Sequence, residues 1–239
     1  SRSITTDWSA AHDAGIDFAF VRVASRDTSD GSIYTDTSAD SHIQTALAND
    51  VNVGLYIFSQ AVTEDEAVEE AEYVLDLVDQ YNWDVTMPIV MDREAGRTSK
   101  KLKAGTLSKA KETAVCQAFA DTITEAGYEA CVYASYSWIR NYINTDELSD
   151  CGLWISRYYN PTTSNSKSGT PYADVAFDYD FWQYSSSGKV DGYAKNLDVD
   201  FWYKDMSDET TGLKMKSNTA GSVTLSWDAT GDAQKYRVY

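Results

Sequence analysis

The feature that most constrains the fold is a regular alternation of strand-like and helix-like segments over the first 135 residues. Apolar runs of strand length alternate with segments of helical period, in the order strand 18–25, helix 39–49, strand 53–59, helix 64–80, strand 88–94, helix 107–126 and strand 130–135. Strands that alternate with helices pair in parallel, because each helix returns the chain to the start of the next strand. The first half of the chain therefore predicts an α/β fold with a parallel sheet.

The pattern changes after residue 135. Only a short helical piece is expected, at 138–143, and the remaining strands at 153–158, 180–185 and 197–203 are joined mainly by loops. The loop over 160–173 is long for a compact domain, and long loops are usually functional or mobile. A chain of 239 residues suits one α/β barrel, or one domain with a small companion.

The composition shifts again from residue 205. Val223, Leu225 and Trp227 alternate with polar residues, which indicates an antiparallel β module. Leu213, residues 223–227 and residues 233–239 resemble the first three strands of a fibronectin type III domain, a fold that needs about a hundred residues. We therefore expect a domain over residues 1–205 and a partial fibronectin type III-like module over residues 206–239.

Charge and hydropathy limit the partners. The formal net charge is -17 and the sequence pI is about 4.3, so a nucleic acid or an anionic membrane surface would repel the chain. No apolar stretch approaches the roughly 20 residues that cross a bilayer, and the first residues lack the apolar core of a signal peptide. An export signal, if the protein is secreted, must lie outside these residues.

The three cysteines and two histidines show no ligand spacing typical of zinc sites, so we expect no metal and no cofactor. Cys131 and Cys151 each begin a strand-like run and could form a disulfide between neighbouring strands, with Cys116 in a helix core. Three buried thiols are an equally good interpretation.

Two carboxylates follow an apolar strand within the segment MPIVMDREAG, residues 87–96. Asp92 and Glu94 are two residues apart, so on a strand their side chains point to the same side. Two neighbouring carboxyl groups can hold different protonation states, which glycosidic bond cleavage requires. They form the candidate reaction centre; the competing interpretation is two ordinary polar residues at a strand end.

Aromatic residues are abundant, with 17 Tyr and 7 Trp, and suit either sugar stacking or barrel packing. Strand alternation lets Trp154 share a face with Tyr158, and Trp182 with Tyr184. Arg22 and Ala24 share a face by the same rule and are assigned a structural role. The candidates for a sugar-binding groove are Tyr56, Tyr133, Trp154, Tyr158, Trp182 and Tyr184.

Several segments together carry a family resemblance. They are DWSAAHDAGIDFAFVRVAS (7–25), VNVGLYIFSQ (51–60), DEAVEEAEYVL (65–75), VMDRE (90–94), ACVYAS (130–135), LWISRY (153–158), FWQYSSSGKVDGY (181–193) and LDVDFW (197–202). Over about residues 4–203 the chain resembles family 25 glycoside hydrolases, the muramidases often called Chalaropsis-type lysozymes. The resemblance implies a modified TIM-like (β/α)5(β)3 barrel, in agreement with the loss of helices after residue 135.

The resemblance also implies an activity, cleavage of the β-1,4 bond between N-acetylmuramic acid and N-acetylglucosamine in peptidoglycan. Glu94 matches the general acid and Asp92 its partner carboxylate, and we expect burial and the charge of Asp92 to raise the pKa of Glu94. Asp198 matches a family acidic residue facing the same cavity and is the third catalytic candidate, while Asp200, two residues on along the same strand face, is a candidate for substrate binding. One of the two should complete the site, and the competing interpretation of either is a surface or hydrogen-bonded aspartate. Strand spacing suits both retention and inversion; the resemblance implies retention, with the substrate's N-acetyl group as nucleophile.

Two positions depart from the family pattern. A first strand carrying an active-site Asp is expected before residue 4, and we favour a sequence that begins after that strand over a barrel that lacks it, because unpaired edges are costly. Arg93 stands where the family usually has an apolar residue facing the helices, and we expect its side chain to snorkel.

The leading interpretation is a secreted muramidase that acts as a monomer on peptidoglycan, outside the cell or at the cell wall. The alternative is a catalytically inactive barrel that only binds cell-wall glycan. A barrel hydrolase acting on another polysaccharide is less favoured, because WQYSSSGKV and the DVD sequence occur together with Asp-x-Glu.

Overall fold

A computed structural model describes residues 6–94, 107–158, 175–193, 195–203, 214–219 and 222–226 of the chain. The chain divides into two compact units, Ser1–Trp202 and Tyr203–Tyr239. In the first unit the elements are α1 (Trp8–Asp13), β1 (Phe18–Arg26), β2 (Ile33–Thr35), α2 (Ala39–Leu47), β3 (Asn52–Ser59), α3 (Glu64–Tyr81), β4 (Ile89–Arg93), α4 (Lys109–Glu125), β5 (Ala130–Ser135), α5 (Tyr136–Tyr142), a 3-10 turn (Thr145–Glu147), β6 (Cys151–Ser156), β7 (Phe181–Gly188) and β8 (Leu197–Trp202).

The strands form one curled, eight-stranded sheet in the order β2-β1-β3-β4-β5-β6-β7-β8. Strands β1 and β3 to β7 run parallel to their neighbours, whereas β2 and β8 pair antiparallel at the two ends. Chain order and sheet order agree from β3 onwards, as expected when each strand is laid beside the previous one. This confirms the predicted α/β class of the modified TIM-like barrel.

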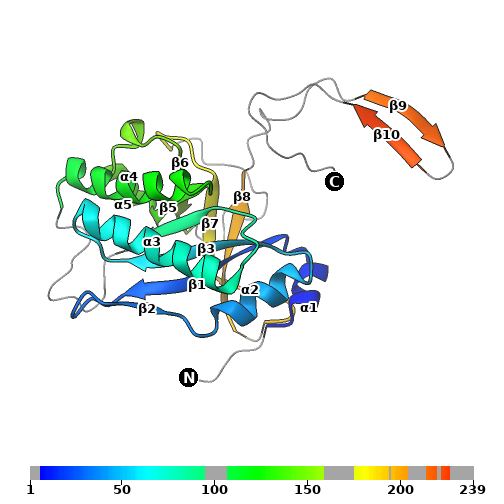
Figure 1. Ribbon diagram of the computed structural model, residues 1–239, viewed down its shortest axis with the longest axis horizontal. Coiled ribbons are helices and arrows are strands. Elements are labelled where there is room, and N and C mark those ends of the chain that lie inside the picture. Colours follow the sequence, from blue (N-terminus) through cyan, green and yellow to red (C-terminus); the bar gives the residue numbers. More distant parts are fainter. Residues whose placement is uncertain are drawn as a thin grey trace. The chain divides into compact units, whose positions relative to one another are not determined.

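Helices α2, α3 and α4 lie side by side over one face of the sheet (Figure 1), where α2 and α3 pack on β1 and β3 and α4 packs on β4 and β5. Local sequence sets their ends. The Thr63 hydroxyl accepts the Glu66 N–H at the start of α3, and Asn82 in the left-handed conformation ends that helix. The Ser108 hydroxyl caps α4 in the same way.

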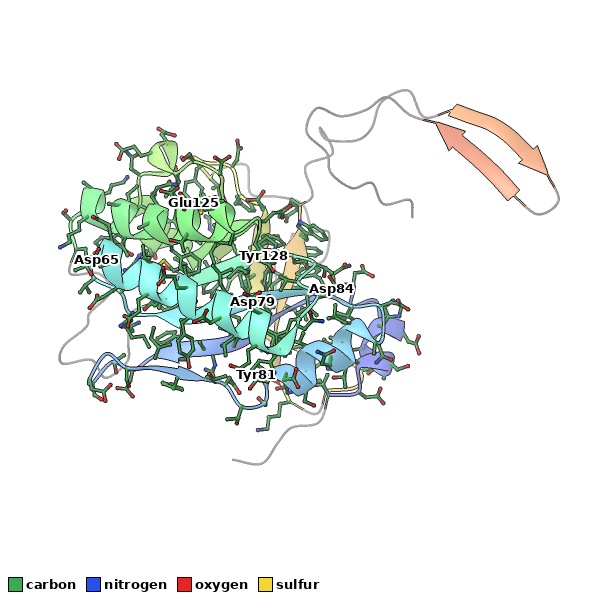
Figure 2. All side chains as sticks on the ribbon, viewed as in Figure 1. Asp65, Asp79, Tyr81, Asp84, Glu125 and Tyr128 are labelled. Carbon is green, nitrogen blue, oxygen red and sulfur yellow. The ribbon has the colours of Figure 1, made fainter. Side chains whose placement is uncertain are left out.

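The outer surface of this helix layer is acidic. Figure 2 shows Asp65 and Asp79 on α3 and Glu125 at the end of α4 pointing away from the sheet, and all three side chains are exposed. Acidic residues are expected on the solvent-exposed face of an amphipathic helix, so part of the strongly negative net charge needs no ligand-binding role to explain it. No helix among the described residues is long and apolar enough to cross a bilayer.

The two faces of the sheet have different cores. Toward the helices, alternate strand residues such as Leu55, Ile57, Ile89 and Met91 are fully buried. Toward the concave face, which we call the lumen, the packed cluster is largely aromatic: Met87, Val90, Cys131, Tyr133, Trp154 and Phe181, with Phe18, Phe20, Tyr56 and Trp202 against it. On each strand, the residues that lie an even number of positions from these cluster residues therefore also point into the lumen.

A register shift in β1 corrects one expectation from alternation. Arg22 pairs with Tyr56 but Ala24 pairs with Ile57, so one extra residue is inserted between them. Tyr56 belongs to the lumen side and Ile57 to the helix side, and their partners follow the same division. Arg22 and Ala24 consequently lie on opposite faces, and the prediction that they share one is wrong.

Strands β1 and β8 approach each other through side chains. No pairing joins them among the described strands, but the Phe18 and Trp202 rings meet edge to face with centroids 5.9 Å apart. The start of α1 is tied to the segment between β7 and β8, where the Asp7 N–H donates to the Gly192 carbonyl at 2.9 Å. Gly192 has a φ of 85°, and a Cβ there would meet the Asp7 carbonyl.

The cysteines are all free thiols. Cys131 pairs with Gly152 and Ala130 with Cys151, so the two cysteines lie one residue out of register on adjacent strands and point to opposite faces. The disulfide interpretation is thereby excluded. The alternative prediction was three buried free thiols. All three cysteines are free, and Cys116 and Cys131 are buried, but Cys151 is only half-buried.

The second unit contains an antiparallel hairpin of β9 (Lys214–Thr219) and β10 (Ser222–Ser226). Antiparallel pairing agrees with the alternation that begins at Val223. The other predicted positions of this module, Leu213, Trp227 and residues 233–239, lie outside the described residues, as does the whole of the predicted 160–173 loop.

Candidate active site

The two predicted carboxylates lie at the carboxyl end of β4, and their environments differ. Asp92 faces the lumen, pairs in register with Phe58 and Tyr133, and is only 8% exposed. Its Oδ1 has no hydrogen-bond partner among the described residues. Glu94 follows the last strand residue and is exposed. The expected burial of Glu94 is therefore wrong; Asp92 is the buried member of the pair.

Burial is the main reason that the pKa of Asp92 lies well above its usual range. The nearby charge of Glu94 raises this pKa further, whereas the guanidinium groups of Arg93 and Arg22 oppose the rise. A carboxyl group with this pKa keeps its proton at a pH where ordinary aspartates are ionised. The two neighbouring carboxyl groups thus differ in environment, one buried and one exposed, and such a difference lets a carboxyl pair take separate roles in acid–base chemistry.

Tyr56 of β3 lies among the charged groups of the lumen. Burial raises its pKa to about 12, and the charges of Asp92 and Asp198 act in the same direction while Arg22 opposes them. Arg22 is half-exposed and binds Asp36 through two nitrogens, Nη2 at 3.0 Å and Nε at 3.3 Å. The sequence suggested only a structural role for Arg22, but the structure places this cation beside the reaction centre.

Two further carboxylates come from β8. Asp200 accepts a hydrogen bond from Trp154 Nε1 at 2.7 Å, and burial raises its pKa to about 7 despite that bond. Asp198 is more exposed, and partial removal of water raises its pKa as well. The charge of Asp198 contributes to the raised pKa of both Tyr56 and Tyr158, which indicates that Asp198 lies near these two side chains.

Two of the predicted aromatic residues meet at a residue that sequence analysis did not select, and a third packs on one of them. Tyr133 and Tyr158 both donate their hydroxyl protons to Gln183 Oε1, at 2.8 and 2.6 Å. Trp154 packs edge to face on Tyr133 with centroids 4.6 Å apart. Gln183 is buried, and its position inside the WQYSSSGKV segment is the signal that could have identified it.

Trp182 and Tyr184 are not brought to the lumen. Trp182 pairs in register with Ile155, a residue of the outer face, and it is fully buried. Tyr184 stacks on Phe201 with centroids 4.6 Å apart, and Trp182 packs against both rings. Their predicted common face is the outer one. Trp182 Nε1 also donates to the Arg157 carbonyl at 3.0 Å, and burial, together with the charge of Asp200, raises the pKa of Tyr184.

No group of three or more histidine, cysteine, aspartate or glutamate side chains suitable for a metal ion lies within the part of the chain described. A separate hollow of about 360 Å³ opens where β4 to β7 begin, with Pro88, Ala130, Gly152 and Phe181 among its lining residues. It lies at the opposite end of these parallel strands from Asp92 and Glu94. The carboxylate cluster is thus distinct from this hollow.

Comparison with known proteins agrees with this geometry. Residues 3–193 match the family described as Glycosyl hydrolases family 25. No match was found among the curated proteins.

Three solved structures share the fold. The modular autolysin LytC from Streptococcus pneumoniae is 22% identical, with a TM-score of 0.68 over 84% of this chain and 44% of that chain. A bacterial lysozyme from Streptomyces coelicolor is 19% identical, with a TM-score of 0.61 over 85% and 88%. A muramidase from Trichobolus zukalii is 19% identical, with a TM-score of 0.60 over 85% and 90%.

The chain spans less than half the length of LytC, and at these identities the likeness concerns the fold. The family match is more specific, because it includes the strand ending in Asp92 and Glu94 and the segment containing Gln183. Since that match spans residues 3–193 of 239, the chain belongs to the glycosyl hydrolases of family 25.

Proposed function

We propose that this protein is a peptidoglycan hydrolase that cleaves the β-1,4 bond between N-acetylmuramic acid and N-acetylglucosamine. The observation that carries the proposal is the buried Asp92 carboxyl, whose Oδ1 has no partner within the described part of the chain, beside the exposed Glu94 in a family 25 chain. An unmatched buried acceptor costs stability unless a ligand completes it. LytC has been solved in complex with a synthetic peptidoglycan ligand, which supports the choice of substrate.

In this proposal Glu94 is the general acid. Its exposure leaves it free to meet a glycosidic oxygen, to which it gives its proton as the bond to the anomeric carbon breaks. The carbonyl oxygen of the substrate's N-acetyl group attacks that carbon, and Asp92 Oδ1 accepts the acetamido N–H. Water then opens the cyclic intermediate and returns a proton to Glu94, so configuration is retained.

The lumen-facing residues of the neighbouring strands complete the proposed site. Asp198 lies at its rim and assists catalysis, while Asp200 holds Trp154 in place. Tyr56 and the Tyr133, Tyr158 and Gln183 cluster form the sugar-binding wall. Tyr158 is 54% exposed, which suits an aromatic ring available for stacking on a sugar.

Hydrolysis of purified peptidoglycan tests the proposal, with new reducing ends as the readout. We expect the wild type to expose N-acetylmuramic acid at the reducing end and to leave chitin largely intact. Glu94→Gln should lower the rate roughly 100- to 10,000-fold, because it removes the transferable proton. Glu125→Gln, an exposed carboxylate on the outer helix layer, is the matched control and should keep the wild-type rate.

Two outcomes would contradict this account. Full activity in Glu94→Gln would remove that residue as the acid. A wild type that sediments with peptidoglycan but releases no reducing ends would favour the inactive glycan-binding barrel instead. Products with N-acetylglucosamine at the reducing end would assign a different bond.

We further propose that the protein acts as a monomer. We expect it to act outside the cell or at the cell wall, because its proposed substrate lies there. LytC is described as an autolysin, and another related structure is the endolysin CTP1L, in keeping with this location.

We also propose that a catalytic domain over residues 1–205 is followed from residue 206 by a fibronectin type III-like module. The antiparallel β9–β10 hairpin supports that module.

A further inference from the structure

The end of β4 has little support from the sheet itself. Pairing with β5 ends at Asp92 and pairing with β3 ends at Arg93, so Glu94 lies beyond both ladders. An exposed residue past the last ladder hydrogen bond has considerable backbone freedom. A carboxyl group that must meet a bond within a fraction of an ångström needs another restraint.

Gln60 provides one restraint. This fully buried side chain directly follows β3, and its Nε2 donates to the Glu94 carbonyl at 3.1 Å and to the Ser59 carbonyl at 2.7 Å. Both partners are acceptors, which fixes the orientation of the amide. The Gln60 N–H in turn donates to Glu70, whose carboxylate is held by Arg26 at 2.7 Å. Gln60 therefore replaces the missing ladder bond at Glu94 and is itself held rigidly.

Arg93 provides the second restraint, on the opposite face of the strand from Asp92. Its guanidinium is fully buried and forms a two-pronged pair with Glu112 of α4, both N···O distances being 2.9 Å. Nη1 also donates to Ser59 Oγ at 3.0 Å and to the Ala61 carbonyl at 2.9 Å. The expected snorkelling of Arg93 does not occur, because every one of these partners lies inside the protein.

We propose that Gln60 and the Arg93–Glu112 ion pair are positioning residues that hold the end of β4 so that Asp92 and Glu94 act on one bond. The inference deepens the proposed function and rests on it. A pair that only docked α4 would need no contact with the end of β3, yet Arg93 also binds Ser59, the last residue of β3, and Ala61 just beyond it. Gln60 touches Glu94 directly, on the far side of that same segment.

The first test compares Gln60→Met with the wild type in peptidoglycan hydrolysis. Methionine has a similar length but no N–H donor, so the Glu94 carbonyl loses its restraint while the volume is kept. We expect kcat to fall roughly 10- to 100-fold with KM changed by less than about twofold. Val74→Ala on α3 controls for lost stability, because it opens a cavity under a helix that packs on β1 and β3.

The second test separates the charge of Arg93 from its geometry. Arg93→Lys keeps the positive charge but loses the fork, so we expect kcat to fall while the Asp92 carboxyl, followed by carbon-13 NMR, titrates as in the wild type. In Arg93→Met/Glu112→Gln, which removes both charges, the Asp92 titration midpoint should move upward. The arginine charge opposes the effect of burial on this group, and Glu112 is not among its charged neighbours.

Unchanged kcat in Gln60→Met, or an equal loss in Val74→Ala, would overturn the proposal for Gln60. Wild-type kcat in Arg93→Lys would overturn it for the ion pair, and so would an Asp92 midpoint that moves in Arg93→Lys, because the loss of kcat would then follow from a changed charge rather than from changed geometry. If the wild type hydrolyses no glycan, the proposed function fails. The NMR titration needs no substrate, so its outcome still decides whether Arg93 controls Asp92.

Discussion

Each face of β4 carries one buried ionisable side chain, and the two differ in whether they have hydrogen-bond partners. Arg93, toward the helices, finds a carboxylate, a hydroxyl and a carbonyl within hydrogen-bond distance. Asp92, the preceding residue, turns toward the lumen, where its Oδ1 has no partner in the described structure and its pKa is raised by burial. We call the helix side, where Arg93 has these partners, the matched face, and the lumen side, where Asp92 Oδ1 has none in the described structure, the unmatched face.

The same division extends to other strands. On the helix side Arg26 of β1 forms ion pairs with Glu70 and Glu69, each at 2.7 Å. On the lumen side Asp200 accepts one hydrogen bond from a neutral donor. Buried charges that are paired maintain the fold, whereas buried carboxyl groups without a cation destabilise it and are retained where a ligand or a reaction needs them. We infer from this difference that the active site lies on the lumen face.

The largest expected effect concerns the matched face. Arg93→Met leaves Glu112 buried without its cation, so we expect a loss of roughly 3 to 5 kcal/mol in the free energy of unfolding, measured in urea. Arg93→Met/Glu112→Leu removes both charges and should lose clearly less than the single variant. Equal losses in the two variants would show that the pair contributes through packing alone, and the comparison between the faces would fail.

A smaller effect of opposite sign is expected on the unmatched face. The raised pKa of Asp200, about 7, means that the unfolded chain releases this proton before the folded protein does. Wild-type stability should therefore fall as pH rises from 4 to 7, and Asp200→Asn should be spared that loss. We expect the variant to be more stable by roughly 2 kcal/mol at pH 8 and nearly equal at pH 4, because partial exposure reduces the full effect of the shift.

A variant that is destabilised at pH 8 would contradict this sign. Asparagine keeps an oxygen that accepts from Trp154, so a loss could not be blamed on that hydrogen bond.

Sequence patterns predicted most of the fold, because alternation and period report directly on which residues a strand or helix buries. The β/α order through β5 is confirmed, and among the described residues after β5 the only helical pieces are the short α5 and the 3-10 turn. Three-residue β2 was not predicted, since a segment that short shows no period. The bulge in β1 was not predicted either. An inserted residue reverses the side of the sheet to which every later residue of the strand points, but it leaves the composition of the strand unchanged.

The candidate site was predicted less completely. Alternation predicted that Asp92 and Glu94 point to the same side, but it could not tell which of the two would be buried, because that depends on where the ladder ends. Trp182 and Tyr184 share a face as predicted, but alternation does not say which side of the sheet that face is on. Gln60 and Gln183 were missed because a single amide shows its role only through partners far along the chain.

The most direct test of the central claim is the unfolding of Asp92→Asn beside the wild type in urea at pH 8, with hydrolysis measured on the same samples. Burial has raised the pKa of Asp92, so the ionisation of this residue favours the unfolded wild-type chain and cannot do so in the variant. The account predicts a variant that unfolds at higher urea concentration and has lost hydrolysis. A variant that is less stable than the wild type, or as active, would contradict it.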